Sequence, residues 1–164
     1  MKYDEEFLSY IDEILNSSEF QKRKKFEHHE NESVYDHSLN VAYSSYLYAK
    51  KHNLNKRDIS IGAILHDFYY EPWKTSKKKK AFFKKHGFTH AKEARDNAYK
   101  FFPHLMNEKI ENIILRHMFP LNIKLPKYKE SWIVTMMDKK CSLKVLMYPK
   151  VWPEYLGIKK RRRE

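Results

Sequence analysis

One short stretch decides how the rest of this chain is read. Residues 61–67 have the sequence Ile-Gly-Ala-Ile-Leu-His-Asp, so an apolar run ends in His66 and Asp67. Neighbouring side chains on a helix point about 100° apart, and a His-Asp doublet can therefore grip one metal ion from two directions. A carboxylate that ends an apolar run needs a strong partner to offset its desolvation. Gly62 and Ala63, one turn before His66, leave room for a neighbouring helix to approach a metal site closely.

Similar residues recur along the chain at comparable intervals. One histidine precedes the doublet, and two histidines and an aspartate follow it, at successive intervals of 29, 24, 27 and 21 residues. A single buried histidine is more often a hydrogen-bonded core residue than a ligand, but the whole set indicates a metal centre. Imidazole and carboxylate groups without thiolates suit Fe, Mn, Co, Ni or Zn and argue against a structural zinc site. The candidate ligands are His37, His66, Asp67, His90, His117 and Asp138.

The composition indicates a folded helical domain. The 164 residues include 41% hydrophobic and 15% aromatic side chains, too many for a disordered chain, and only three glycines. We expect one domain over residues 1–164. No apolar run approaches the roughly 18–20 residues that span a bilayer, and the N-terminal residues do not form a signal peptide. The one cysteine, Cys141, cannot form an internal disulfide, so we expect a cytoplasmic protein without a membrane partner.

Apolar periodicity and capping residues predict six or seven helices in an all-α bundle. Ser33, Thr89 and Asn107 are the expected N-caps, and Gly87 is expected to end a helix. The predicted helices cover residues 4–16, 33–51, 56–67, 77–85, 90–102, a segment from 107 toward Pro120, and one between 126 and 148.

The net charge of +12 is concentrated in three basic runs, at residues 22–25, 77–80 and 159–163. Such runs can form a surface for nucleic acid or an anionic ligand. They can equally be solvated helix ends and a loose tail, and for residues 159–164 we expect a flexible tail. Nucleic acid is a possible partner that the charge alone does not favour.

Five sequence segments carry a resemblance to a known family. They are Val-Tyr-Asp-His-Ser-Leu-Asn-Val-Ala at 34–42, Gly-Ala-Ile-Leu-His-Asp at 62–67, His-Gly-Phe-Thr-His at 86–90, Arg-His-Met-Phe-Pro at 116–120 and Asp-Lys at 138–139. Over residues 26–146 the chain resembles the small stand-alone bacterial proteins of the HD-domain superfamily, which are chiefly metal-dependent phosphohydrolases with a helical fold. In that superfamily, residues matching His37, His66, Asp67 and Asp138 bind one metal ion. Branches with two further histidines, here His90 and His117, bind a second ion, with the doublet aspartate bridging the two.

The resemblance implies a function. We expect two divalent transition-metal ions (Fe, Mn, Co, Ni or Zn), Asp67 as the central catalytic residue, and hydrolysis of a nucleotide, dinucleotide or other phosphoester. The same ligands would serve an HD-type di-iron oxygenase. A nucleotide- or RNA-binding protein with a structural metal site is a third alternative. Two departures from the family patterns stand out: Tyr70 occupies the place of a lysine in the cyclic-dinucleotide branch, and Glu71 is one residue away from the catalytic glutamate of the nucleotidases.

Several other side chains are candidates for contact with a substrate. Arg116, Lys74 and Lys139 could bind the phosphates of a phosphorylated small molecule, for which a nucleotide is the expected class. The alternative interpretation is that these are ordinary loop and surface residues. His29 lies in a segment that could fold over the site.

Overall fold

The computed structural model describes residues 3–26, 33–70 and 82–146 of the chain. Within these residues it contains seven α-helices, two short 3-10 helices and no strand, which confirms the predicted all-α bundle. The elements are α1 (Glu5–Asn16), α2 (Ser18–Gln21), η1 (Lys22–Lys25), α3 (Val34–Lys51), α4 (Lys56–Ile64), α5 (Phe82–Phe101), η2 (Pro103–Leu105), α6 (Glu108–Arg116) and α7 (Lys129–Leu146).

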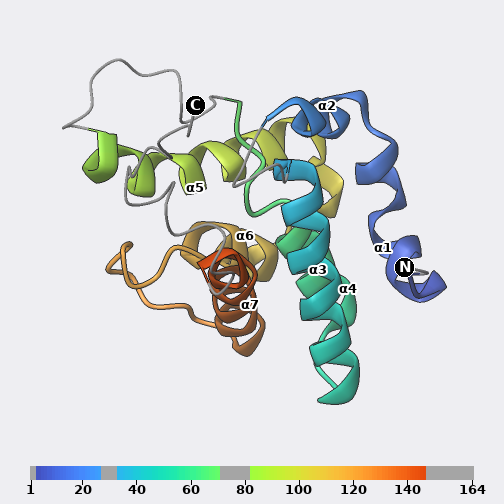
Figure 1. Ribbon diagram of the computed structural model, residues 1–164. Helices are drawn as coiled ribbons and strands as arrows, with labels where there is room; N and C mark the ends of the chain where they lie inside the picture. The colour runs from blue at the N-terminus through green and yellow to red at the C-terminus, as the bar shows by residue number, and fades with distance from the viewer. Residues whose placement is uncertain (1–2, 27–32, 71–81, 147–164) are drawn as a thin grey trace, which may run out of the picture.

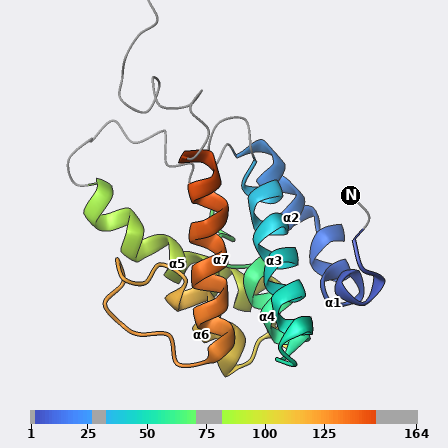
Figure 2. The ribbon, with the colours of Figure 1, turned by 60° about the horizontal axis from the view of Figure 1, so that its bottom comes forward.

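Helix α4 lies at the centre of the bundle. It packs against α1, α3, α6 and α7, while α3 also packs against α7, and α5 packs against α6. Figure 1 shows α3 and α4 running alongside each other with α5 crosswise to them, and Figure 2 shows α7 beside α3. The His-Asp doublet comes just after α4. The central position of this helix therefore places the doublet where the other helices meet.

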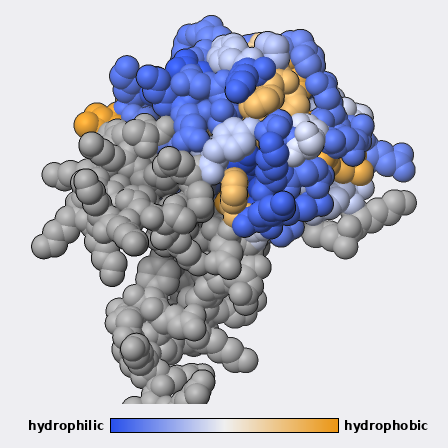
Figure 3. All heavy atoms as spheres, turned by 90° about the horizontal axis from the view of Figure 1, so that it is seen from above, coloured by the Kyte–Doolittle hydropathy of each residue, from blue (hydrophilic) through white to orange (hydrophobic). Residues whose placement is uncertain are grey.

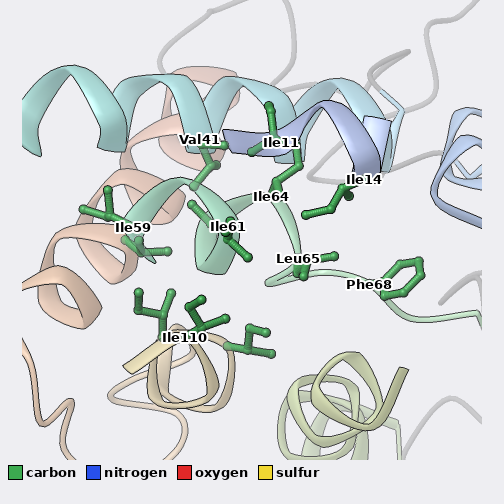
Figure 4. Packing of buried hydrophobic residues seen from close by; sticks show 14 of the residues in the cluster. Ile11, Ile14, Val41, Ile59, Ile61, Ile64, Leu65, Phe68 and Ile110 are labelled. Atoms are coloured by element: carbon green, nitrogen blue, oxygen red, sulfur yellow. The ribbon is translucent and has the colours of Figure 1, made fainter. Parts of the chain in front are cut away.

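The core forms around the apolar residues of α4. Four large apolar side chains in and just after this helix are fully buried: Ile59, Ile61, Ile64 and Leu65. Figure 4 shows apolar side chains from α1, α3 and α6 around them, among them Ile11, Val41 and Ile110. Full burial of one such side chain contributes roughly 1.5–3 kcal/mol to the free energy of folding. The apolar run that precedes the doublet therefore holds the doublet in place.

Polar side chains cap two helices as the sequence predicted. Ser33 Oγ accepts a hydrogen bond from the Asp36 backbone N–H at 3.1 Å and begins α3. Asn107 Oδ1 accepts one from the Ile110 backbone N–H at 2.9 Å and begins α6. Each bond satisfies a donor that the first turn of a helix leaves unpaired. These caps fix where the two helices that carry His37 and lead to His117 start.

Helix α4 is shorter than predicted. It ends at Ile64 with Leu65 as its C-cap, so His66 and Asp67 lie in the following turn rather than on the helix. A backbone hydrogen bond of 3.2 Å from Phe68 to Leu65 closes this turn. The doublet can therefore point in directions that an ideal helix would not allow.

The prediction of two helices around residues 77–102 was wrong within the described part of this segment. Helix α5 runs without a break through Gly87 and Thr89, which therefore neither end nor cap a helix. An internal glycine costs only about 1 kcal/mol relative to alanine, and no proline interrupts the segment. His90 consequently lies inside α5 and not in a first turn.

The basic run at residues 22–25 is not a uniformly exposed surface. It forms η1, in which Arg23 is completely buried. The Arg23 guanidinium carbon lies 4.3 Å from the centroid of the Tyr70 ring and 5.1 Å from that of the Phe68 ring. Such contacts with aromatic faces offset part of the cost of burying the charge. The other two basic runs, at 77–80 and 159–163, lie outside the described residues.

One face of the bundle is largely polar where the structure describes it (Figure 3). Seen from above, most of the described surface is hydrophilic, with a few separate hydrophobic areas (Figure 3). Among the described helices, none is both long enough and apolar enough to cross a membrane.

Gly62 allows α6 to lie directly against α4, and its replacement by alanine should destabilise the fold. An added Cβ would lie 2.7 Å from Ile113 Cγ2 and 2.8 Å from Ile113 Cδ1. We expect Gly62→Ala to lower the free energy of unfolding by about 1–3 kcal/mol, the usual cost of overpacking, as measured by denaturant titration. The loss should be smaller in an Ile113→Val background, which lacks Cδ1. A higher midpoint for Gly62→Ala would mean that helix propensity outweighs the contact.

Candidate metal centre

Six side chains from five parts of the chain converge in the interior of the bundle. They form two groups in which the possible ligand atoms all lie within 4.8 Å of one another. The first group comprises His37, His66 and Asp138, and the second comprises Asp67, His90 and His117. The structure thus brings together every residue that the sequence singled out as a candidate metal ligand.

The first group joins α3, the turn after α4, and α7. His37 Nε2 lies 3.1 Å from Asp138 Oδ1, and His66 Nε2 lies 3.7 Å from the same oxygen. His37 and His66 are completely buried. One carboxylate oxygen of Asp138 therefore faces two imidazole nitrogens.

The second group joins the same turn to α5 and to the end of α6. Asp67 Oδ1 lies 3.7 Å from His90 Nε2 and 3.6 Å from His117 Nε2. The two imidazole nitrogens lie 3.1 Å from each other. All three side chains are buried.

Asp67 connects the two groups through its two carboxylate oxygens. Oδ1 faces His90 and His117, whereas Oδ2 lies 3.5 Å from His66 Nε2 in the first group. A carboxylate in this position can share its charge between two cations. This geometry is what a bridging ligand requires.

Two of the histidines are oriented by the ends of helices. His66 Nδ1 lies 2.6 Å from the Ala63 carbonyl oxygen, and His117 Nδ1 lies 2.7 Å from the Ile114 carbonyl oxygen. Both carbonyls belong to the last turn of a helix, where backbone acceptors lack helical partners. Because a carbonyl only accepts, Nδ1 must donate, which leaves Nε2 as the nitrogen available to a metal ion. The negative ends of the α4 and α6 dipoles also favour a cation here.

Burial and charge set opposite protonation states for these two histidines. Burial disfavours the charged form of His66, but the negative charges of Asp67 and Asp138 outweigh it and raise its pKa to about 9. For His117, burial and the neighbouring His66 lower the pKa to about 3. Burial opposes ionisation of Asp138 as well, yet His37 and His66 hold its pKa well below the usual range. The cluster therefore keeps its carboxylate charged inside the protein.

A divalent metal ion fits each group. Metal bonds to imidazole nitrogen or carboxylate oxygen of about 2.0–2.2 Å let one ion sit among atoms separated by the distances given above. His66 Nε2 is buried and has no hydrogen-bond partner among the described residues, and a metal ion would satisfy it. His37, His66 and Asp138 would hold one ion, and Asp67, His90 and His117 the other.

The candidate substrate contacts lie close to these ligands in the chain. Lys139 follows Asp138, and its Nζ donates to the backbone carbonyl of His117 at 3.4 Å and to that of Phe119. Arg116 is half-buried at the end of α6, directly before His117. The other sequence candidates, Lys74, Glu71 and His29, lie outside the described residues.

A family model supports the assignment of the whole region. The model of the HD domain matches residues 34–143, a span that contains all six clustered residues. The chain belongs to the HD-domain family. This membership makes it a member of a superfamily of metal-dependent hydrolases. No curated protein and no solved structure matches the chain.

Some groups that surround the HD-domain site had no clear signal in the sequence. The Tyr69 ring packs edge-on against the His90 ring, with centroids 5.7 Å apart, and only its position two residues after the doublet could have pointed to it. The orienting carbonyls of Ala63 and Ile114 each stand three residues before a histidine at a helix end. That spacing is a signal that a search for helix ends could have used.

Binding of a metal ion should depend on pH through His66. Its pKa of about 9 means that the metal-free cluster carries a proton at pH 7, which an ion must displace. Affinity for Mn²⁺ should therefore rise from pH 7 to 8.5, by up to about tenfold per unit. Calorimetry in buffers of different ionisation enthalpy should show proton release. His104→Ala, an exposed control, should behave like the wild type, and an affinity independent of pH in this range would contradict the expectation.

Proposed function

We propose that the protein is a metal-dependent phosphohydrolase that uses two divalent transition-metal ions. The observation that carries the proposal is the position of Asp67, whose two oxygens face two separate groups of ligands. A purely structural metal site has no need of a carboxylate between two ion positions. Membership of the HD-domain family supports the reaction class.

Each side chain of the cluster would have a defined role in holding the ions. Asp67 would be a ligand of both ions, because its two oxygens face the two groups. His37, His66 and Asp138 complete one position, and His90 and His117 complete the other. His117 stays neutral because its pKa is about 3, so the lone pair on its Nε2 can bind a cation at physiological pH. When bound, the two ions would lower the pKa of a water molecule, and their positive charge would stabilise the charge on the phosphoryl oxygens.

The expected substrate is a phosphorylated small molecule, and we favour a nucleotide or dinucleotide. Arg116 stands beside a ligand histidine, and Lys139 stands beside Asp138. Either cation could stabilise the charge on a phosphate group or on a leaving group. Lys74 is proposed for the same role from the sequence alone. The net charge of +12 would attract such anions over a longer range.

The proposed reaction can be tested with a panel of phosphomonoesters and phosphodiesters. Chelation should abolish hydrolysis, and Mn²⁺, Fe²⁺ or Co²⁺ should restore it better than Ca²⁺, since imidazole ligands disfavour calcium. Each assay should be run with and without oxygen, and oxygen uptake should be recorded for the iron-loaded protein. Oxygen consumption with no cleavage of any phosphoester would replace the proposal with the di-iron oxygenase alternative. Nucleotide binding without either reaction would favour the binding-protein alternative.

The bridging role of Asp67 can be tested by mutation. Asp67→Ala should reduce turnover by more than about 100-fold, the upper end of the loss caused by residues that only orient metal ligands. It should also lower metal content more than His90→Ala, because it removes a ligand of both ions rather than of one. Activity and metal content can be measured on the same preparations. Two bound ions and near-normal turnover in Asp67→Ala would rule out the bridge.

A further inference from the structure

The three residues that follow the doublet are held by α5. Asn97 Nδ2 donates to the Phe68 carbonyl oxygen at 2.8 Å, and Glu93 Oε1 accepts from the Tyr70 backbone N–H at 2.8 Å. His90, Glu93 and Asn97 share one face of α5, because residues spaced by three and seven positions lie on the same side of a helix. One face of α5 therefore carries the candidate metal ligand His90 and also holds, through two hydrogen bonds, the backbone next to Asp67.

These two hydrogen bonds lie close to the carboxylate that faces both ligand groups. The Tyr69 backbone N–H donates to the Asp67 carbonyl oxygen at 2.9 Å, which ties Asp67 to residues 68–70. Asp67 Oδ1 in turn faces His90 Nε2 at 3.7 Å. Helix α5 thus supplies His90 and also fixes the turn that carries Asp67 opposite it. The relative position of these two side chains depends on the same helix.

The side chains of the turn are held from the opposite direction. The Tyr70 hydroxyl donates to the Glu19 carboxylate, and the buried Arg23 guanidinium contacts the rings of Phe68 and Tyr70. These contacts come from α2 and η1. They anchor the rings, whereas the two hydrogen bonds from α5 hold the backbone of residues 68 and 70.

The three side chains of the first ligand group do not depend on these hydrogen bonds from α5. His66 is oriented by the Ala63 carbonyl within its own helix end, and His37 and Asp138 come from α3 and α7. Loosening residues 68–70 would displace Asp67, which faces both groups, while His37, His66 and Asp138 keep their own supports. The second group would therefore lose more of its geometry than the first.

We propose that Glu93 and Asn97 are positioning residues that set the affinity of the second ion position, formed by Asp67, His90 and His117, more strongly than that of the first. The inference rests on the proposed two-ion function. Residues that only orient metal ligands commonly change metal affinity by about 10- to 100-fold when removed. Neither side chain is a candidate metal ligand, so the effect would come through the backbone of the turn.

The test measures binding of Mn²⁺ by calorimetry and by electron paramagnetic resonance, which reports coupling between two neighbouring Mn²⁺ ions. Glu93→Ala and Asn97→Asp should weaken the second binding step about 10- to 100-fold and abolish the coupled signal at limiting Mn²⁺. The first step should weaken by less than the second, because His37, His66 and Asp138 are held by other parts of the chain. Glu93→Gln should retain wild-type binding, because its amide oxygen can still accept from Tyr70 N–H. Asn97→Asp keeps the shape of the side chain but replaces the donor with an acceptor.

Asp96→Ala is the matched control, since Asp96 is exposed on the same helix and pairs with Arg95 at 2.6 Å. It should bind both ions like the wild type. Equal weakening of both steps in Glu93→Ala and Asn97→Asp, or the same loss in Glu93→Gln, would overturn the inference, as would a wild-type protein that binds one ion. Selective loss of the second ion in a protein that cleaves no phosphoester would uphold the inference and refute the proposed reaction. If both binding steps weakened equally in a protein that hydrolyses a phosphoester, the inference would be refuted and the proposed reaction would be upheld.

Discussion

The negative charge of two largely buried carboxylates is the constraint on which the rest of this structure depends. Asp67 is buried and the Asp138 side chain is 13% exposed, and an uncompensated charge in such surroundings costs several kcal/mol. Four histidines surround them, and each comes from a different part of the chain. Helices α3, α5, α6 and α7 and the turn after α4 must therefore meet at one place. The central position of α4 and the close contact at Gly62 follow from the same requirement.

Helix ends, rather than helix middles, orient two of the six residues. His66 follows α4 and His117 ends α6, and each uses Nδ1 to satisfy a carbonyl of its own last turn. One hydrogen bond thus completes a helix end and aims Nε2 at the centre. The negative ends of two helix dipoles point to the same region, where they favour cations. The same hydrogen bond therefore serves both the end of the helix and the orientation of the candidate metal ligand.

The turn after the doublet shows how charged and aromatic residues share a structural task. Arg23 belongs to a run of four basic residues, and its burial against Phe68 and Tyr70 gives it a packing role that its neighbours lack. Burial lowers the pKa of Arg23, and the neighbouring tyrosines and the carboxylates Glu19 and Glu93 partly counter this. A basic run in a sequence can therefore combine exposed lysines with one residue that belongs to the interior.

The sequence by itself determined the helices and the chemistry of the centre. Apolar periodicity and the caps Ser33 and Asn107 act within a few residues, so they could be read directly. The six histidines and aspartates could be identified because they recur at intervals of one helix and one loop. The same local reasoning placed two helix boundaries wrongly, since an internal glycine such as Gly87 does not have to end a helix.

Only the tertiary structure decided the end of α4 at Ile64, the burial of Arg23 and the two directions in which Asp67 faces. It also decided that Glu93 and Asn97 hold the turn beside Asp67. Apart from the end of α4, these features depend on partners 23 to 50 residues apart, as in the bond from Tyr70 to Glu93 and the approach of Asp67 to His117. Local propensity carries no information about such partners, because the cost of a buried charge or an unpaired backbone group is met only when distant segments come together.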